Sequence, residues 1–256
     1  AHVVIHAGHV ETMYAGSYGG TTYNVYLTVD GGRVDSIVGS TNNGNATLGN
    51  VYTQLLGGQI GTYMTGNSVQ GDVRVDLSSK VTGLTSIQAS TAGFSNGKRA
   101  TLNLINENAD GAMFNMKGVT INGFDVINIG TDNLVAFDVR YFMNDQTAAT
   151  SNPHVVELTG TGRVIMGNDG ESTRGEGVYK LVVNKGIVLD LETCFIHEQK
   201  STDTYPTIVI KDGATLDVSN RPTSTGGGIA IRLEISGHGV DGLGALYKGG
   251  NVQLKA

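Results

Sequence analysis

The chain has 256 residues, of which 38 are glycine and 3 are proline; 16% are charged, and the formal net charge is -6. This charge leaves no basic surface of the kind that neutralises phosphates, which argues against nucleic acid and anionic membrane surfaces as partners. No apolar stretch approaches the roughly 20 residues that a membrane-spanning helix needs. The composition indicates a chain of strands and glycine-rich turns.

A strand-turn-strand phrase recurs in the first ninety residues. Steps of 24, 26 and 21 residues separate Gly8, Gly32, Gly58 and Ser79, which occupy the same place in four copies. Recurrence at a nearly fixed period predicts stacked structural units. The copies run over residues 5–10, 29–34, 55–60 and 77–81.

Most segments between these turns alternate apolar and polar residues. Val25, Leu27 and Val29 fall on one face of an expected strand, and Tyr26 and Thr28 fall on the other. Such period-2 patterning is typical of strands with one buried side. The same pattern places further residues inward: Val73, Val75, Leu102, Leu104, Phe137, Val139 and Tyr141.

The repeat becomes looser after residue 100. Residues 185–191 align with 212–218 at a step of 27, which places Asp190 over Asp217, and a related phrase from Gly162 precedes the first of these by 24 residues. These periods predict an all-β fold, a single-stranded right-handed parallel β-helix (β-solenoid) with about ten rungs of 21–27 residues. Each rung is expected to hold three short strands.

The repeats run through the whole chain, so we predict one continuous β-helix domain over residues 1–256. Residues 1–90 form its regular glycine-rich rungs, and residues 91–256 form looser rungs with loop inserts. Both ends lie in expected strands without a cap, although solenoids normally cover their end strands. We therefore interpret the chain as a segment of a larger protein.

A glycine-spaced turn near the C-terminus is followed by Gly-Ala-Leu over residues 235–247 and by a further strand over 249–254. This phrase resembles the autotransporter-associated β-strand repeat. The resemblance implies an exported bacterial passenger region with a β-helical fold, located extracellularly or at the cell surface, whose signal peptide is not in this chain. Such passengers are often adhesins and sometimes enzymes, so a glycan or a host or matrix surface is the expected partner.

Inserts interrupt the repeat near residues 143–154, 167–177, 199–206 and 220–228, at intervals of roughly one rung. If they leave the coil at a similar corner, they form a ridge suited to hydroxyl-rich ligands. The alternative is that they are solvated turns, because loops are polar by default. The ligand-binding candidates are Asp145, His154, Glu171, Arg174, Glu176, Lys200, Asp203 and Tyr205.

Two constellations suggest catalysis. Asp138 and Arg140 stand two apart in an expected strand and should project together from its outer face, where an exposed ion pair explains them equally well. Glu192, His197 and Glu198 follow Asp190, and paired carboxylates near an imidazole can act as general acid and base on a glycosidic bond. Asp190 recurs as Asp217 one rung further on, so a repeated structural position at a turn also explains it without catalysis.

No cofactor is expected, because the histidines show no Cys/His cluster at zinc spacing. Calcium held by Asp169 and Glu171 is a weaker alternative. We prefer an exported cell-surface protein with a structural or adhesive role, which binds a glycan or a host or matrix ligand through the insert ridge. The alternative is a carbohydrate-active β-helix enzyme, either a polysaccharide lyase or a glycoside hydrolase.

Overall fold

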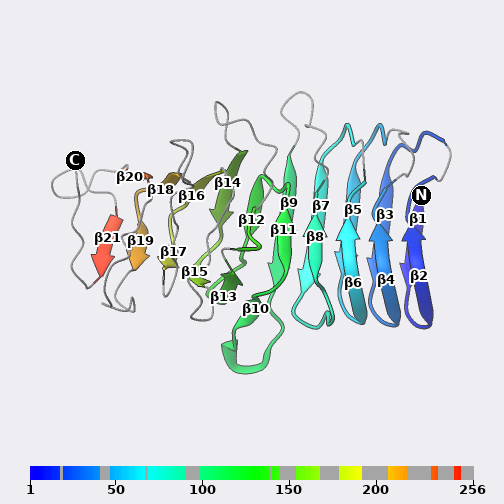
Figure 1. Cartoon of the computed structure of the whole chain (residues 1–256), viewed down its shortest axis with the longest axis horizontal. Coiled ribbons are helices and arrows are strands. Elements are labelled where there is room, and N and C mark those ends of the chain that lie inside the picture. The colour runs from blue at the N-terminus through cyan, green and yellow to red at the C-terminus, as the bar shows by residue number, and fades with distance from the viewer. Residues whose placement is uncertain are drawn as a thin grey trace.

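The computed structural model shows an elongated stack of strands that runs in chain order from β1 to β21 (Figure 1). No helix in its described part is long and apolar enough to cross a membrane. The structure describes residues 1–17, 20–40, 47–66, 69–89, 99–138, 140–143, 154–167, 179–191, 207–217, 232–235 and 245–248.

One face of the stack is a ten-stranded sheet, the long sheet, in which each strand pairs in parallel with its equivalent one turn further along. Neighbours in such a sheet lie about 4.8 Å apart, so the sheet extends along the axis of the stack. Its strands are β1 (His2–Ile5), β3 (Val25–Val29), β5 (Val51–Leu55), β7 (Val73–Ser78), β9 (Ala100–Ile105), β12 (Val126–Asn128), β14 (His154–Thr159), β16 (Tyr179–Val183), β18 (Thr207–Ile210) and β20 (Arg232–Ile235).

Two shorter parallel sheets complete the coil. The N-terminal sheet consists of β2 (His9–Tyr14), β4 (Arg33–Val38), β6 (Gln59–Met64), β8 (Ser86–Gln88) and β11 (Thr120–Asn122). The C-terminal sheet consists of β10 (Phe114–Met116), β13 (Asn133–Asp138), β15 (Gly162–Gly167), β17 (Ile187–Asp190), β19 (Ala214–Asp217) and β21 (Ala245–Lys248). A 3-10 turn, η1 (Ala109–Gly111), precedes β10, where the second of these sheets begins.

The parallel β-solenoid predicted from the sequence is confirmed, but the number of rungs differs from the prediction of about ten rungs of three strands. In the described residues the long sheet has ten strands, whereas the other two sheets have six and five. The stacking of Asp190 on Asp217 is confirmed. Gly162 pairs with Ile187, one residue beyond the expected step of 24, because Gly186 belongs to the preceding turn.

The recurring turn phrase joins the long sheet to the N-terminal sheet. Gly8, Gly32 and Gly58 have φ angles of +91°, +74° and +86°, a region that glycine adopts without steric cost. The turns also stack closely, since a Cβ atom on Gly58 would lie 2.7 Å from the Gly32 carbonyl oxygen. The repeated glycine is therefore required both by its own backbone and by the turn beneath it.

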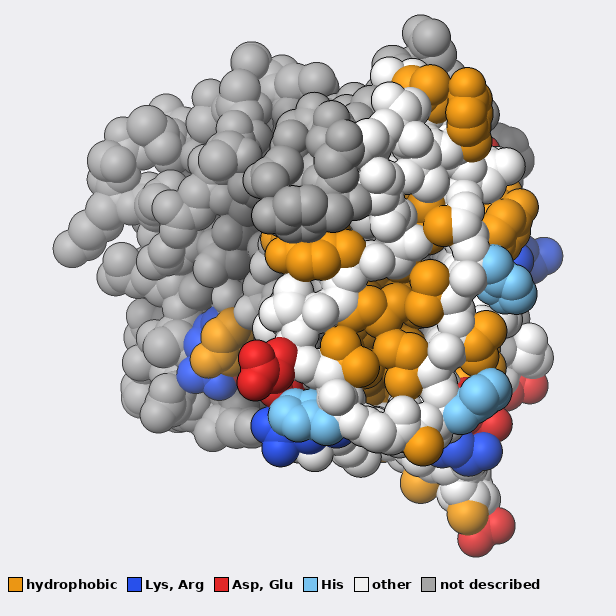
Figure 2. Space-filling view, turned by 90° about the vertical axis from the view of Figure 1, so that its right-hand side faces the viewer, with side chains coloured by type: hydrophobic (Ala, Val, Ile, Leu, Met, Phe, Trp, Pro, Cys, Tyr) orange, Lys and Arg blue, Asp and Glu red, His pale blue; other side chains and the backbone are white. Residues whose placement is uncertain are grey.

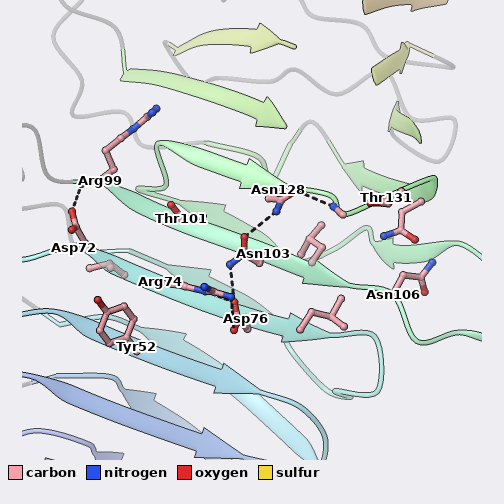
Figure 3. A pocket seen from close by; sticks show the side chains of 15 residues that line it. Tyr52, Asp72, Arg74, Asp76, Arg99, Thr101, Asn103, Asn106, Asn128 and Thr131 are labelled. Atoms are coloured by element: carbon pink, nitrogen blue, oxygen red, sulfur yellow. Dashed lines mark hydrogen bonds and ion pairs between the residues drawn. The ribbon is translucent and has the colours of Figure 1, made fainter. Parts of the chain in front are cut away.

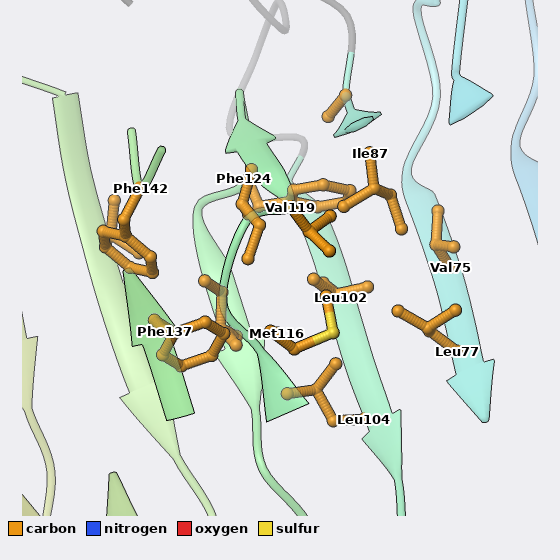
Figure 4. Packing of buried hydrophobic residues seen from close by; sticks show 14 of the residues in the cluster. Val75, Leu77, Ile87, Leu102, Leu104, Met116, Val119, Phe124, Phe137 and Phe142 are labelled. Carbon is orange, nitrogen blue, oxygen red and sulfur yellow. The ribbon is translucent and has the colours of Figure 1, made fainter. Parts of the chain in front are cut away.

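Aliphatic and aromatic side chains from successive turns fill the interior (Figure 4). Leu102 and Met116 lie at its centre, and the rings of Phe137 and Phe142 pack at 5.2 Å between centroids. Tyr141, which was predicted to point inward, is 37% exposed. The strand ends at Asp138 and the chain turns, so the alternation that placed Phe137 inside does not continue to Tyr141.

Tyr63 is a buried polar group within this core, where its hydroxyl is 2.9 Å from the Thr53 hydroxyl. Burial raises the pKa of Tyr63 to about 12, although hydrogen bonds from Thr53 and Thr65 act in the opposite direction. The neutral phenol is thus favoured in the folded state. Its contribution to stability is complete below the unfolded pKa of about 10 and is lost as the pH rises through about 12.

We expect the free energy of unfolding to fall by about 2 to 3 kcal/mol between pH 9 and pH 12 because of this residue. Tyr63→Phe should be less stable than the parent at pH 8, since it loses the Thr53 hydrogen bond, but should show a flatter alkaline profile. Denaturant unfolding at several pH values measures both effects. Parallel profiles for the two proteins would contradict the assignment.

The end of the stack that carries β1 exposes apolar side chains at its centre, surrounded by backbone and by histidine and charged groups (Figure 2). Val3, Ile5 and Val10 pack against the core but are only partly buried. Their equivalents one turn inward, Leu27 and Val34 among them, are fully buried. Each turn therefore completes the burial of its neighbour.

Candidate functional site: a groove along the long sheet

Two adjoining hollows of about 790 and 490 Å³ lie on the outer face of the long sheet. They share Tyr52, Arg74 and Asp76, so we treat them as one groove that crosses β1, β3, β5, β7, β9 and β12. Polar and aromatic side chains line it: His2, Tyr26, Thr28, Tyr52, Gln54, Asp72, Arg74, Asp76, Arg99, Thr101, Asn103, Asn106, Asn128, Thr131 and Asn133.

Strand alternation and parallel register create the groove. In β7, Val73 and Val75 point into the core, so Arg74 and Asp76 point outward. Register then aligns the outward positions of successive strands in two columns. The first column runs His2, Tyr26, Tyr52, Arg74 and Thr101, and the second runs Thr28, Gln54, Asp76, Asn103 and Asn128.

The end of the groove nearest β1 is aromatic. The rings of Tyr26 and Tyr52 stack with centroids 5.4 Å apart and planes 23° apart, and His2 meets Tyr26 edge-on at 6.3 Å. Tyr26 is 46% exposed, so part of this side chain is accessible to a ligand. Tyrosine rings provide a large apolar surface, while the phenol supplies a hydrogen-bonding group.

The centre of the groove holds a bidentate ion pair. Arg74 donates from Nε and one terminal nitrogen to the two carboxylate oxygens of Asp76, at 2.9 and 3.2 Å. These hydrogen bonds and the negative charge of Asp76 raise the pKa of Arg74. The Asp76 side chain is 9% exposed and that of Arg74 is 57% exposed, so the cation faces the solvent over a carboxylate held beneath it.

Asparagine amides continue the network beyond Asp76 (Figure 3). Asn103 donates from Nδ2 to Asp76 at 2.7 Å, and Asn128 donates from Nδ2 to the Asn103 Oδ1 at 3.3 Å. The Gly130 N–H donates to the Asn128 Oδ1 at 3.0 Å. Because a carboxylate only accepts, the donor and the acceptor of each of these three hydrogen bonds are fixed.

The rim of the groove is also charge-balanced. Arg99 contacts Glu157 at 3.0 Å, and its backbone N–H donates to Asp72 at 3.3 Å. Among the aspartates and arginines that line the groove, two negative charges, Asp72 and Asp76, offset two positive charges, Arg74 and Arg99. The lining is therefore polar without a net charge from these groups.

Asp138 and Arg140, predicted as a catalytic pair or an exposed ion pair, do form an ion pair, at 2.9 Å from Arg140 Nε to the carboxylate. The carboxylate of Asp138 is buried, with a side chain that is 2% exposed, whereas the Arg140 side chain is 25% exposed. Asp138 also accepts from the Arg140 backbone N–H and so closes the turn after β13. These contacts give the pair a structural role at the corner.

His154, a predicted ligand-binding residue, begins β14 and lies apart from the groove. Its Nε2 is 2.9 Å from the Phe124 carbonyl oxygen and 3.7 Å from Asp125, so it links β14 to the segment before β12. The other predicted residues lie outside the described residues, as does most of the proposed insert ridge. They are Asp145, Asp169, Glu171, Arg174, Glu176, Glu192, His197, Glu198, Lys200, Asp203 and Tyr205.

A second charged cluster lies on the C-terminal sheet. Arg163 of β15 contacts Asp190 of β17 and reaches Asp217 of β19 at 2.9 Å, and both carboxylates are 3% exposed. Burial opposes the charge of Arg163, but hydrogen bonds with Asp217 and Asp190 outweigh it and raise the pKa of the guanidinium. Within the described segments, no three histidine, cysteine, aspartate or glutamate residues are grouped as a metal site.

The groove was not found from the sequence, although a signal for it exists. Tyr26 and Tyr52 are 26 residues apart, the same step that separates Gly32 from Gly58. If the turns are aligned on their repeated glycines, the two tyrosines fall at equivalent outward positions and are expected to lie side by side. The later asparagines are harder to align because the turn phrase has weakened there.

A scan against protein-family models found no match for this chain, and searches of curated proteins and of solved structures gave no significant match. The functional argument therefore depends on the fold and the groove.

Proposed function

We propose that the chain is an exported bacterial surface protein with a structural or adhesive role, and that it binds a glycan through the groove of the long sheet. The observation that carries the proposal is the continuous run of stacked tyrosines, ion pair and amides across β1 to β12. Glycans present both apolar ring faces and hydroxyl groups, and this lining offers a partner for each. The solenoid acts as the rigid support that holds these groups in register.

A carbohydrate-active enzyme receives less support from the groove. Its two lining carboxylates, Asp72 and Asp76, are four residues apart on one extended segment, or about 13 Å along the chain. The carboxyl groups of glycoside hydrolases lie about 5 to 10 Å apart on opposite sides of the bond that they cleave. Arg74 also lies between the two aspartates and binds one of them.

Tyr52→Ala should weaken glycan binding at least tenfold, which corresponds to about 1.4 kcal/mol, because it removes the ring shared by both hollows. A glycan array identifies the retained glycans, and calorimetric titration measures affinity for the best of them. Incubation with the same glycan, followed by chain-length analysis, tests for cleavage.

Tyr23→Ala is the matched control, since Tyr23 is 73% exposed and does not line the groove. It should bind as the parent does. Equal losses in both variants, or no retained glycan, would contradict the proposal. Shortening of the retained chain would instead favour the enzyme.

A further inference from the structure

The amides of the groove have a consequence for the kind of glycan that fits. Three hydrogen bonds lead from the Gly130 N–H through Asn128 and Asn103 to Asp76. Each of the two asparagines uses one Nδ2 hydrogen and its Oδ1 in them. Each amide nitrogen keeps a second hydrogen, for which no hydrogen bond is found among the described residues. Both amides belong to the outward columns, so these donors belong to the surface of the groove.

The two donors have a defined spacing. Asn103 and Asn128 are directly paired on neighbouring strands, and such strands lie about 4.8 Å apart. A ligand that accepts from both must carry oxygen atoms repeated along the axis of the stack, not along one strand. The stacked rings of Tyr26 and Tyr52 repeat along the same axis.

The size and charge of the groove restrict the ligand further. Six strands, from β1 to β12, span about 24 Å at the same spacing. Asp76 is neutralised by Arg74, and Glu157 lies against Arg99, so neither arginine is left to be the sole partner of an anionic ligand. A carboxylate of the ligand would therefore meet arginines whose charge is already offset, and we expect it to gain less here than at an unpaired cation.

We infer that the groove takes an extended, uncharged glycan laid parallel to the solenoid axis, with a sugar ring against Tyr26 and Tyr52 and its hydroxyl or ring oxygens accepting from Asn103 and Asn128. This inference rests on the proposed function and adds to it the direction, charge and minimum length of the ligand. A short sugar occupies only one end of the groove. A chain of several units reaches both the rings and the amides.

The test uses linear oligomers of two to six units of β-1,4-linked glucose, mannose and xylose, with α-1,4-linked galacturonate oligomers as the anionic series. At least one uncharged series should bind with an affinity that rises tenfold or more between two and five units. The galacturonate series should bind more weakly at every length.

Asn128→Asp provides a nearly isosteric variant that keeps the oxygen for the Gly130 N–H but removes the amide donors. It should lose at least tenfold in affinity for the pentamer and much less for the dimer. Asn115→Asp is its matched control, because the exposed Asn115 likewise accepts from a backbone N–H two residues on, that of Lys117, and lies outside the groove. Thermal unfolding of both variants verifies that they fold.

Affinity that does not depend on length, tighter binding of galacturonates, or equal effects of the two aspartate variants would overturn the inference. Binding of a branched glycan from the array, with loss in Tyr52→Ala but no binding of any linear series, would overturn it and leave the proposed function in place. Failure of every glycan to bind would overturn both.

Discussion

Replacing Arg163 with methionine is expected to lower the free energy of unfolding by about 3 kcal/mol, because two buried carboxylates depend on this guanidinium. Arg163 joins Asp190 and Asp217 across three strands of the C-terminal sheet. Methionine retains much of the apolar packing of the arginine side chain but no charge. Two buried aspartates on adjacent turns then lose their contact with this cation. Denaturant unfolding at neutral pH measures the loss.

Arg33→Met is the control for this experiment. Arg33 donates to Asp35 at 2.7 Å, but the two side chains are 53% and 39% exposed. Exposed ion pairs of this kind contribute about 0 to 1 kcal/mol. A loss in Arg163→Met no larger than that in Arg33→Met would show that the buried cluster does not stabilise the fold as described.

Gly58→Ala is expected to destabilise the protein by about 3 kcal/mol or more, from two separate causes. A non-glycine residue in the left-handed region costs about 1 to 2 kcal/mol. The new Cβ would also lie 2.7 Å from the Gly32 carbonyl oxygen and 2.8 Å from the Gly31 carbonyl carbon, so the stacked turns must move apart. Thermal and denaturant unfolding give the size of the effect.

Gly8→Ala separates these two causes. Gly8 occupies the same place in the first copy of the turn, with a similar φ of +91°, but a Cβ there would meet no atom within 4 Å. It should cost only about 1 to 2 kcal/mol for the backbone conformation. Equal losses at Gly8 and Gly58 would show that close stacking of the turns contributes nothing.

The stacked architecture was predictable because its cause is local and repeated. Val25, Leu27 and Val29 are buried as their alternation indicates, and the spacing of Gly8, Gly32 and Gly58 matches the observed register of the strands that follow. The change from one short sheet to the other near β10 and β11 was not predicted.

The groove was less predictable because it exists only when side chains from distant turns are brought together. Asp76, Asn103 and Asn128 have no common motif and are separated by steps of 27 and 25 residues. A register error of one residue, as at Gly162, moves every side chain of a strand to the other face. The ion pair of Asp138 with Arg140 was expected from the sequence, but the burial of its carboxylate was not.

Turns of a solenoid contact only their immediate neighbours, so the fold behaves mechanically as a chain of links that can open one at a time. The groove crosses six such links, from β1 to β12. A ligand lying along the groove would contact several turns at once and so connect turns that do not contact one another directly. Occupancy would thereby lengthen the unit that opens together, and the turns along the groove would unfold more cooperatively with the ligand bound.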